Sequence, residues 1–210
     1  VRVDRRLGGS LIYEFGAYNA LALVVLGGIG VQQASVGGDY STTQDFAEVG
    51  LGLRWAVLAG LLDVGKGVVA AGLPILLHAG DAVVILAALA AVVGHSRSPF
   101  IHFAGGRGVS PGIGGLLAIA WPAALVGLPV FVVVLAATHI SSIASLTASL
   151  VAAVGMVVVT FVWQLSPLYL AYAVAGTGLI WYFHADNIRR LLAGEERRFG
   201  GGPGRGPSAA

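Results

Sequence analysis

Long apolar stretches alternate with short polar ones along this chain, and this alternation predicts helices that cross a membrane. Two apolar runs, residues 115–137 and 147–163, approach or exceed the roughly 20 residues that a transmembrane helix needs. Together with the shorter runs, they predict spans at about 15–34, 51–77, 81–94, 112–137, a stretch ending near 163, and 168–183. The pattern therefore predicts an all-α, polytopic integral membrane bundle of about five to seven transmembrane helices.

The range of five to seven reflects prolines in the fourth predicted span. The Trp121-Pro122 step and Pro129 each predict a kink or break, because proline removes a helix hydrogen bond and clashes with the preceding turn. Residues 112–137 are therefore either one kinked helix or two short ones. A Ser/Thr-rich step at 138–149 leads into the next predicted span.

Composition limits both the number of domains and the kinds of partner. Of the 210 residues, 57% are hydrophobic and 10% charged, and the mean hydropathy is +0.86. We expect one transmembrane domain over residues 1–199 and a flexible Gly/Pro-rich tail over 200–210. The net charge of +2 and the scattered arginines argue against a nucleic-acid partner, while membrane lipids are expected partners. The chain has no cysteine and no histidine pair with metal-ligand spacing, so we expect neither a metal nor a cofactor.

The most polar loop between two predicted spans is GHSRSPFIHFAGGRGVSPGIG, residues 94–114. Its glycines, Gly105, Gly106 and Gly108, offer backbone N–H groups unobstructed by side chains, and Arg107 adds a guanidinium just before the next helix. Amides at a helix N-terminus and a guanidinium both favour an anion. The loop is therefore either a phosphate cradle or a simple connector, and His95 is either a helix-ending hydrogen-bonding group or a base.

Two further groups of polar residues lie within or beside predicted spans. Asp63 and Lys66 are three residues apart and share a helix face, which favours an ion pair that fixes packing or that also shapes a phosphate site. His184, Asn187 and Leu191 share another face, which either holds a polar substrate group or is structural, whereas Asp186 points elsewhere.

The remaining polar residues near the C-terminal half have simpler expected roles. Small hydroxylated side chains are expected on one helix face as packing residues: Thr138, Ser142 and Ser145. Four arginines are expected to contact lipid headgroups and to place the C-terminus in the cytoplasm: Arg189, Arg190, Arg197 and Arg198.

In their order and spacing, these motifs make the chain resemble the bacterial acyl-phosphate:glycerol-3-phosphate acyltransferases. The family pattern G-H-x-x-P-v-F-x-x-F-x-G-G-K-G-V-A-T corresponds to GHSRSPFIHFAGGRGVSP, with Arg107 at the lysine position. The pattern H-R-x-N-I-x-R-L-L-x-G-x-E corresponds to HADNIRRLLAGEE, from His184 to Glu196, and D-x-x-K-G corresponds to Asp63, Lys66 and Gly67. A looser echo of T-R-Y-V-S-L-G-S begins at Thr138.

The first family motif, G-S-G-N-x-G-A-T-N followed by an arginine, is poorly matched by VGGDYSTTQDFAEV. Gly38 and Thr43 agree with the pattern, whereas Gly37 stands at the serine position and Ala47 at the arginine position. This departure leaves open a second function class: a non-catalytic relative that binds phospholipid or phosphate.

The resemblance implies a membrane enzyme that acylates the 1-hydroxyl of glycerol 3-phosphate with acyl phosphate as donor, giving lysophosphatidic acid for phospholipid synthesis. It implies a bacterial inner-membrane location with the active-site loops on the cytoplasmic side. The resemblance further implies catalytic roles for Arg107, His184 and Asn187. The implied substrate-binding residues are Asp63, Lys66, His95, Gly105, Gly106, Gly108, Val109, Thr43, Ser142 and Arg190.

Overall fold

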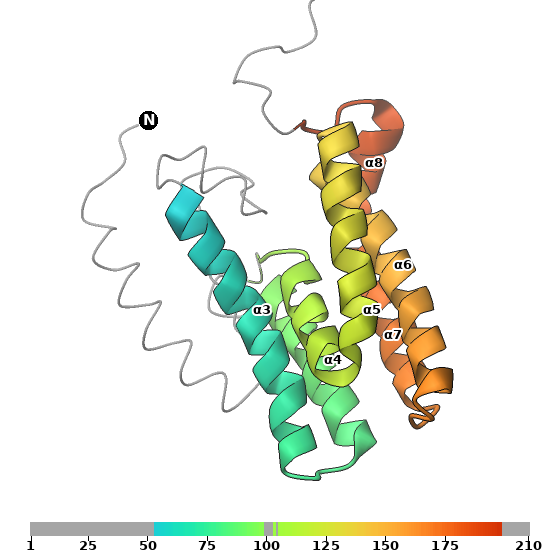
Figure 1. The fold of residues 1–210 in the computed structure, drawn as a ribbon. Helices are drawn as coiled ribbons and strands as arrows, with labels where there is room; N and C mark the ends of the chain where they lie inside the picture. Colours follow the sequence, from blue (N-terminus) through green and yellow to red (C-terminus); the bar gives the residue numbers. More distant parts are fainter. Residues whose placement is uncertain (1–52, 99–102, 104, 199–210) are drawn as a thin grey trace, which may run out of the picture.

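The computed structural model describes residues 53–98, 103 and 105–198, and the regular elements in these ranges are all helices (Figure 1). The six helices are α3 (Leu53–Leu76), α4 (Asp81–Ser96), α5 (Val109–Thr138), α6 (Ser141–Val162), α7 (Tyr169–Phe183) and α8 (Ala185–Ala193). The all-α prediction is confirmed, and the spans expected from residue 51 onward agree with helices. The expected span at 15–34, the candidate residue Thr43 and the tail at 200–210 lie outside the described residues.

Chain direction brings several helix ends to one side of the bundle. Helices α3 and α4 form an antiparallel hairpin, and α6 and α7 form a second one (Figure 1). The C-terminal end of α4, the N-terminal ends of α5 and α6, and the short helix α8 all lie on the same side of the bundle (Figure 1). The loop at 94–114, the Ser/Thr-rich step at 138–149 and the segment that begins at His184 therefore converge at this side, which we call the polar end.

The segment α5 consists of two shorter helices, its two legs, and the chain reverses direction between them (Figure 1), so the second of the two alternatives expected for residues 112–137 is the one observed. Ala120 has non-helical backbone angles, φ −151° and ψ 68°, directly before Trp121 and Pro122, so the predicted kink is confirmed. The break expected at Pro129 is wrong, because the backbone around it stays helical. A proline inside a membrane helix loses one backbone hydrogen bond, which neighbouring groups can offset.

Small residues let both legs of α5 pack closely on their neighbours. A Cβ at Gly114 on the first leg would overlap the Val64 carbonyl of α3, and a Cβ at Gly67 would overlap the Pro111 carbonyl. On the second leg, a Cβ at Gly127 would press on Ala152 of α6. Close backbone contact at small residues is the usual way that membrane helices associate.

The outer surface of the bundle is strongly apolar. Helices α5 and α6 are long and apolar enough to cross a membrane, while α4 and α7 are apolar but only 16 and 15 residues long. Large apolar side chains are exposed along α5 and α6, among them Val132, Val133, Leu150, Val154, Val158 and Phe161. An exposed apolar surface of this extent is typical of a protein surrounded by lipid.

Candidate active site

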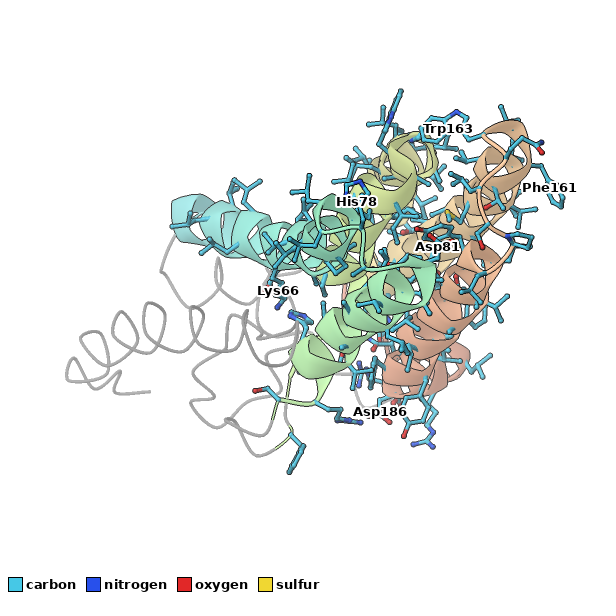
Figure 2. The ribbon with its side chains drawn as sticks, turned by 90° about the horizontal axis from the view of Figure 1, so that it is seen from below. Lys66, His78, Asp81, Phe161, Trp163 and Asp186 are labelled. Atoms are coloured by element: carbon cyan, nitrogen blue, oxygen red, sulfur yellow. The ribbon has the colours of Figure 1, made fainter. Side chains whose placement is uncertain are left out.

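A buried cluster of charged and polar groups joins α3 to the end of α4. Lys66 Nζ lies 2.7 Å from Asp63 Oδ1 and 2.7 Å from His95 Nδ1, and His95 Nδ1 lies 3.4 Å from Asp63 Oδ1. Figure 2 shows Lys66 pointing between the two helices. The predicted Asp63–Lys66 ion pair is confirmed, and His95 completes what we call the α3–α4 cluster.

The glycine-rich loop lies directly on this cluster. The Gly106 N–H donates to the His95 carbonyl at 3.2 Å. A Cβ at Gly106 would overlap the His95 imidazole, and a Cβ at Gly105 would overlap the backbone of His95 and Ser96. Both glycines therefore allow close packing on α4. The expectation that the Gly106 N–H is unobstructed is wrong, because this group is already paired with the chain.

Gly108 sets the direction in which α5 leaves the loop. It is the N-cap of α5, and its φ of +75° lies in the left-handed region that glycine adopts without strain. A Cβ there would also press on Val92 and Ser96. Arg107 and Val109, on either side of Gly108, are both half-buried, so the glycines hold Arg107 at the polar end.

His184 occupies the junction between α7 and α8, with 2% of its surface exposed. Burial lowers the pKa of His184 to about 4; the positive charge of Arg107 adds to this effect, against the opposing contributions of the Ile180 carbonyl and Glu196. The imidazole is therefore neutral near pH 7. Its Nδ1 lies 2.7 Å from the Ile180 carbonyl, which can only accept, so Nδ1 carries the proton and Nε2 is left as an acceptor.

A second cluster surrounds the carboxylate of Glu196. Ser142 Oγ donates to Oε1 at 2.8 Å, Asn187 Nδ2 donates to Oε1 at 2.6 Å, and Arg190 Nε donates to Oε2 at 2.8 Å. Burial alone would raise the pKa of Glu196, but the hydrogen bonds from Asn187, Ser142 and Arg190 outweigh it and hold the pKa below its usual range. This Glu196 cluster ties the start of α6 to α8.

These contacts bear on three expectations for the C-terminal half. Thr138 ends α5 while Ser142 belongs to α6, so the two do not share a helix face. Arg190 pairs with Glu196, and Arg189 pairs with the exposed Asp186 at 3.2 Å, so neither side chain is committed to lipid alone. The face expected from His184 to Leu191 falls within α8 and its N-cap, because the Ile188 N–H donates to the His184 carbonyl at 2.9 Å, and His184 and Asn187 are both buried.

Two buried polar atoms have no hydrogen-bond partner among the described residues: Asn187 Oδ1 and Ser98 Oγ. Asn187 was expected at the site from the sequence. Ser98 was missed, and Glu196 was seen only as a matched position of the last motif. The sequence signal for Glu196 was its position two residues after Gly194. Gly194 ends α8 with a left-handed backbone conformation, and the chain turns back there.

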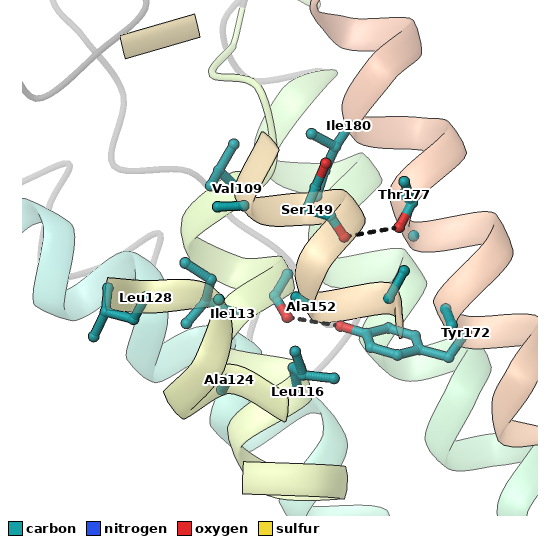
Figure 3. Close-up of a pocket in the computed structure, with 16 residues that line it drawn as sticks. Val109, Ile113, Leu116, Ala124, Leu128, Ser149, Ala152, Tyr172, Thr177 and Ile180 are labelled. Carbon is teal, nitrogen blue, oxygen red and sulfur yellow. Dashed lines mark hydrogen bonds between the residues drawn. The ribbon is translucent and has the colours of Figure 1, made fainter. Parts of the chain in front are cut away.

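An apolar pocket extends from the polar end into the bundle between α5, α6 and α7 (Figure 3). Its volume is about 570 Å³, part of it open to the surroundings. Val109 and Ile180 lie toward one end and Leu116, Ala124 and Tyr172 toward the other (Figure 3). Val109 is two residues from Arg107, and the Ile180 carbonyl contacts His184, so the pocket begins beside both groups. In the described ranges, no group of three His, Cys, Asp or Glu side chains is placed to hold a metal ion.

Three comparisons identify what this arrangement resembles. Residues 13–194 match the family described as "Glycerol-3-phosphate acyltransferase". A protein of that name from Synechococcus sp. (strain JA-3-3Ab) is 42% identical over 181 residues, which cover 83% of this chain and 82% of the relative.

Two crystal structures resemble this fold, both of PlsY (YgiH), an integral membrane glycerol 3-phosphate acyltransferase. The glycerol 3-phosphate form has a TM-score of 0.67 and 31% identity, covering 76% of this chain and 78% of that one. The lysophosphatidic acid form has a TM-score of 0.70 and 28% identity, covering 91% and 96%. With the helical fold, the apolar surface and the ordered motifs, these matches show that the chain is an integral membrane member of the glycerol-3-phosphate acyltransferase family.

Proposed function

We propose that this chain transfers an acyl group from acyl phosphate to the 1-hydroxyl of glycerol 3-phosphate at the polar end of the bundle. The hydroxyl oxygen attacks the carbonyl carbon, the new ester bond forms, and the bond from that carbon to the phosphate oxygen breaks. The products are lysophosphatidic acid and inorganic phosphate, and the hydroxyl proton leaves on the phosphate. Family membership supports the acyltransferase activity and the glycerol 3-phosphate acceptor.

The observation that carries this proposal is the apolar pocket lined by Val109 and Ile180, which lies next to the Arg107 loop and to His184, whose pKa the Arg107 charge lowers. Arg107 binds a phosphate group through its planar guanidinium and stabilises the charge that develops as the acyl phosphate is attacked. Gly105, Gly106, Gly108 and Val109 contribute by holding the loop in position. Asp63, Lys66 and His95 support the loop from beneath.

His184 orients the attacking hydroxyl. Its Nε2 accepts a hydrogen bond from the 1-hydroxyl, because Nδ1 is committed to the Ile180 carbonyl. A pKa of about 4 makes this imidazole a weak base, so it positions the nucleophile rather than retaining the proton. An acyl phosphate is already activated, so such positioning supplies much of the catalysis, up to about 7–11 kcal/mol.

The apolar pocket holds the acyl chain. It is lined mainly by glycine, alanine and larger aliphatic residues, and it begins beside the groups that bind phosphate. With the chain bound there, the carbonyl carbon lies at the polar end and the hydrocarbon chain stays away from water. Ser142 and Arg190 act on the site through the Glu196 cluster rather than by themselves.

We place the enzyme in the bacterial inner membrane, with the polar end on the cytoplasmic side. Arg189, Arg190, Arg197 and Arg198 follow the last apolar helix, and an excess of arginine beside a span marks the cytoplasmic face. Water-soluble glycerol 3-phosphate then reaches the site directly.

The experiment that tests this function is a donor comparison with the purified protein in detergent. Acyl phosphate and glycerol 3-phosphate are expected to give equal amounts of inorganic phosphate and lysophosphatidic acid, whereas acyl thioesters are expected to give no product. Binding of acyl phosphate without turnover would support the non-catalytic relative instead. Turnover with acyl thioesters alone would refute the acyl phosphate donor while leaving the acyltransferase assignment intact.

A further inference from the structure

The apolar pocket has a closed end, which lies away from the polar end. The wall there consists of Tyr172, Leu116 and Ala124 (Figure 3), whose exposed fractions are 4%, 6% and 3%. Ile180, toward the other end of the pocket, follows Tyr172 by eight residues on α7. This spacing corresponds to about 12 Å along a helix, so an acyl chain that enters beside Ile180 meets a wall of buried side chains at that depth.

Tyr172 is the largest side chain in this wall, and its ring is held in place at the far end. The side chain reaches from α7 toward the first leg of α5, where its hydroxyl donates to the Gly112 carbonyl at 2.9 Å (Figure 3). Gly115 makes room for this hydroxyl, because a Cβ there would overlap it. The ring is therefore a rigid wall, unlike a methionine side chain, which adapts its shape to a neighbour.

The residues that line the pocket above this wall are mostly small. Gly176 lies about one helical turn from Tyr172 on α7, and Ala152 and Ala173 line the pocket at similar depth. A Cβ at Gly176 would meet no atom closer than 3.9 Å, so this position leaves space unfilled. Small residues thus keep the pocket wide, whereas one large residue limits its depth.

We propose that Tyr172 determines which acyl chain lengths the enzyme uses, because its ring ends the straight part of the acyl-chain pocket. The inference rests on the proposed function, in which this pocket holds the acyl chain of the donor. The carbonyl carbon has to stay at the polar end, so a chain that is too long cannot slide outward. It has to fold back or leave through the open side of the pocket, where Leu128 is exposed.

The experiment that tests this role is a competition between donors in one reaction. The purified protein in detergent receives glycerol 3-phosphate and an equimolar mixture of saturated acyl phosphates of graded length, and the lysophosphatidic acids formed are quantified by mass spectrometry. Each variant is compared with the wild type in the same mixture, so the partition of each donor into detergent cancels.

Tyr172→Ala is expected to raise the ratio of the longest to the shortest product about tenfold. A methylene more or less in an apolar pocket changes selectivity by about this factor or more, and the vacated ring volume accepts a longer chain. Tyr172→Phe keeps the ring and loses only the hydrogen bond to Gly112. This variant is expected to keep the product distribution of the wild type.

A second substitution fills the pocket instead of deepening it. Gly176→Ala adds a methyl group beside the ring without a steric clash and is expected to lower the same ratio roughly tenfold. Gly178→Ala, on the same helix but outside the pocket, is the matched control and is expected to leave the distribution unchanged. Because Gly176→Ala leaves Tyr172 in place, it decides the question even where Tyr172→Ala prevents folding.

These outcomes separate the inference from the proposed function. A wild type that forms no lysophosphatidic acid from any acyl phosphate would refute the function itself. An active wild type whose product ratios change neither in Tyr172→Ala nor in Gly176→Ala would refute the role of Tyr172 alone. Equal shifts in Tyr172→Phe and Tyr172→Ala would also refute it, because the ring would then not be the wall. A uniform fall in all products at constant ratio would mean that Tyr172 is only a packing residue.

Discussion

The α3–α4 cluster is buried and the Glu196 cluster is partly buried; both contain a carboxylate and a basic side chain, yet their hydrogen-bonding groups are satisfied differently. In the α3–α4 cluster, Lys66 lies between Asp63 and His95, and the glycine-rich loop packs on His95. In the Glu196 cluster, three donors converge on one carboxylate, and Asn187 Oδ1 is left with no partner among the described residues.

This difference distinguishes a cluster that stabilises the fold from a cluster that can bind a ligand. A cluster whose described polar groups pair with one another has little to offer a ligand, and its interactions stabilise the contact between α3 and α4 on which the loop rests. A cluster that leaves one buried acceptor unpaired has a binding site within hydrogen-bond reach. Substitutions in the first should therefore affect folding most, and substitutions in the second should affect substrate binding most.

The largest expected effect comes from breaking the α3–α4 ion pair. Lys66→Met leaves Asp63 buried without the Lys66 cation, and such a change costs about 3–5 kcal/mol. We expect the melting temperature in detergent to fall sharply, or no folded protein to be recovered. Asp63→Asn combined with Lys66→Met removes both charges and should regain most of the loss. A single Lys66→Met variant as stable as the wild type would show that the pair has no structural role.

The next largest effect is expected in the loop that rests on this cluster. Gly106→Ala places a methyl group against the His95 imidazole and shifts Arg107, and misplacement by about 1 Å can cost about 100-fold in rate. We expect kcat/KM to fall by about that factor in the phosphate-release assay. Gly178→Ala in α7 is the matched control, because no atom lies within 4 Å of its new Cβ. Equal activities for the two variants would refute the tight packing of the loop.

Acid should weaken the polar end through His184. The pKa of this imidazole is about 4 in the folded protein against 6.5 in the unfolded chain, so below pH 6.5 the unfolded state binds the extra proton. Stability is therefore present above pH 6.5 and is lost as the pH falls toward 4, by roughly 1–3 kcal/mol. Melting temperatures of the wild type should fall over this window. His184→Asn does not titrate there and should show a flatter profile; parallel profiles would contradict the buried neutral state.

The smallest effect is expected from removing one donor of the Glu196 cluster. Ser142→Ala deletes one of three hydrogen bonds to the carboxylate and should cost about 1 kcal/mol, or roughly 2–4 °C in melting temperature. KM for glycerol 3-phosphate should rise less than for Glu196→Gln, because Asn187 and Arg190 still hold the carboxylate. Ser141→Ala at the preceding position is the control. A loss as large as that of Lys66→Met would mean that the two clusters do not differ as described.

The parts of the fold that the sequence predicts are those with local signals. The apolar runs predicted α3 and α4 to within two residues, because the apolar sequence stops within a few residues of each helix end. The spacing of Asp63 and Lys66 was enough to predict their pair, since residues three apart on a helix share a face. The kink before Pro122 followed from proline chemistry alone.

The parts that the sequence does not predict depend on contacts between distant residues. Ser142 and Glu196 are 54 residues apart, and no local pattern links them. The glycines of the loop were correctly singled out, but their contact with His95 depends on how the loop folds over α4. Neither the neutral state of His184 nor the unpaired acceptor on Asn187 could be foreseen, because both depend on burial.

The measurement that tests the central claim most directly is the conversion of labelled glycerol 3-phosphate into lysophosphatidic acid by two arginine variants. The Arg107 charge acts on His184, and Arg107 is two residues before the pocket residue Val109, whereas Arg97 is exposed and lies over the Phe183 ring at 5.6 Å. With acyl phosphate as donor, we expect the wild type and Arg97→Ala to form product at rates within about threefold, and Arg107→Ala to lose about 100- to 1,000-fold. Substantial product formation by Arg107→Ala would contradict the placement of the active site at the polar end.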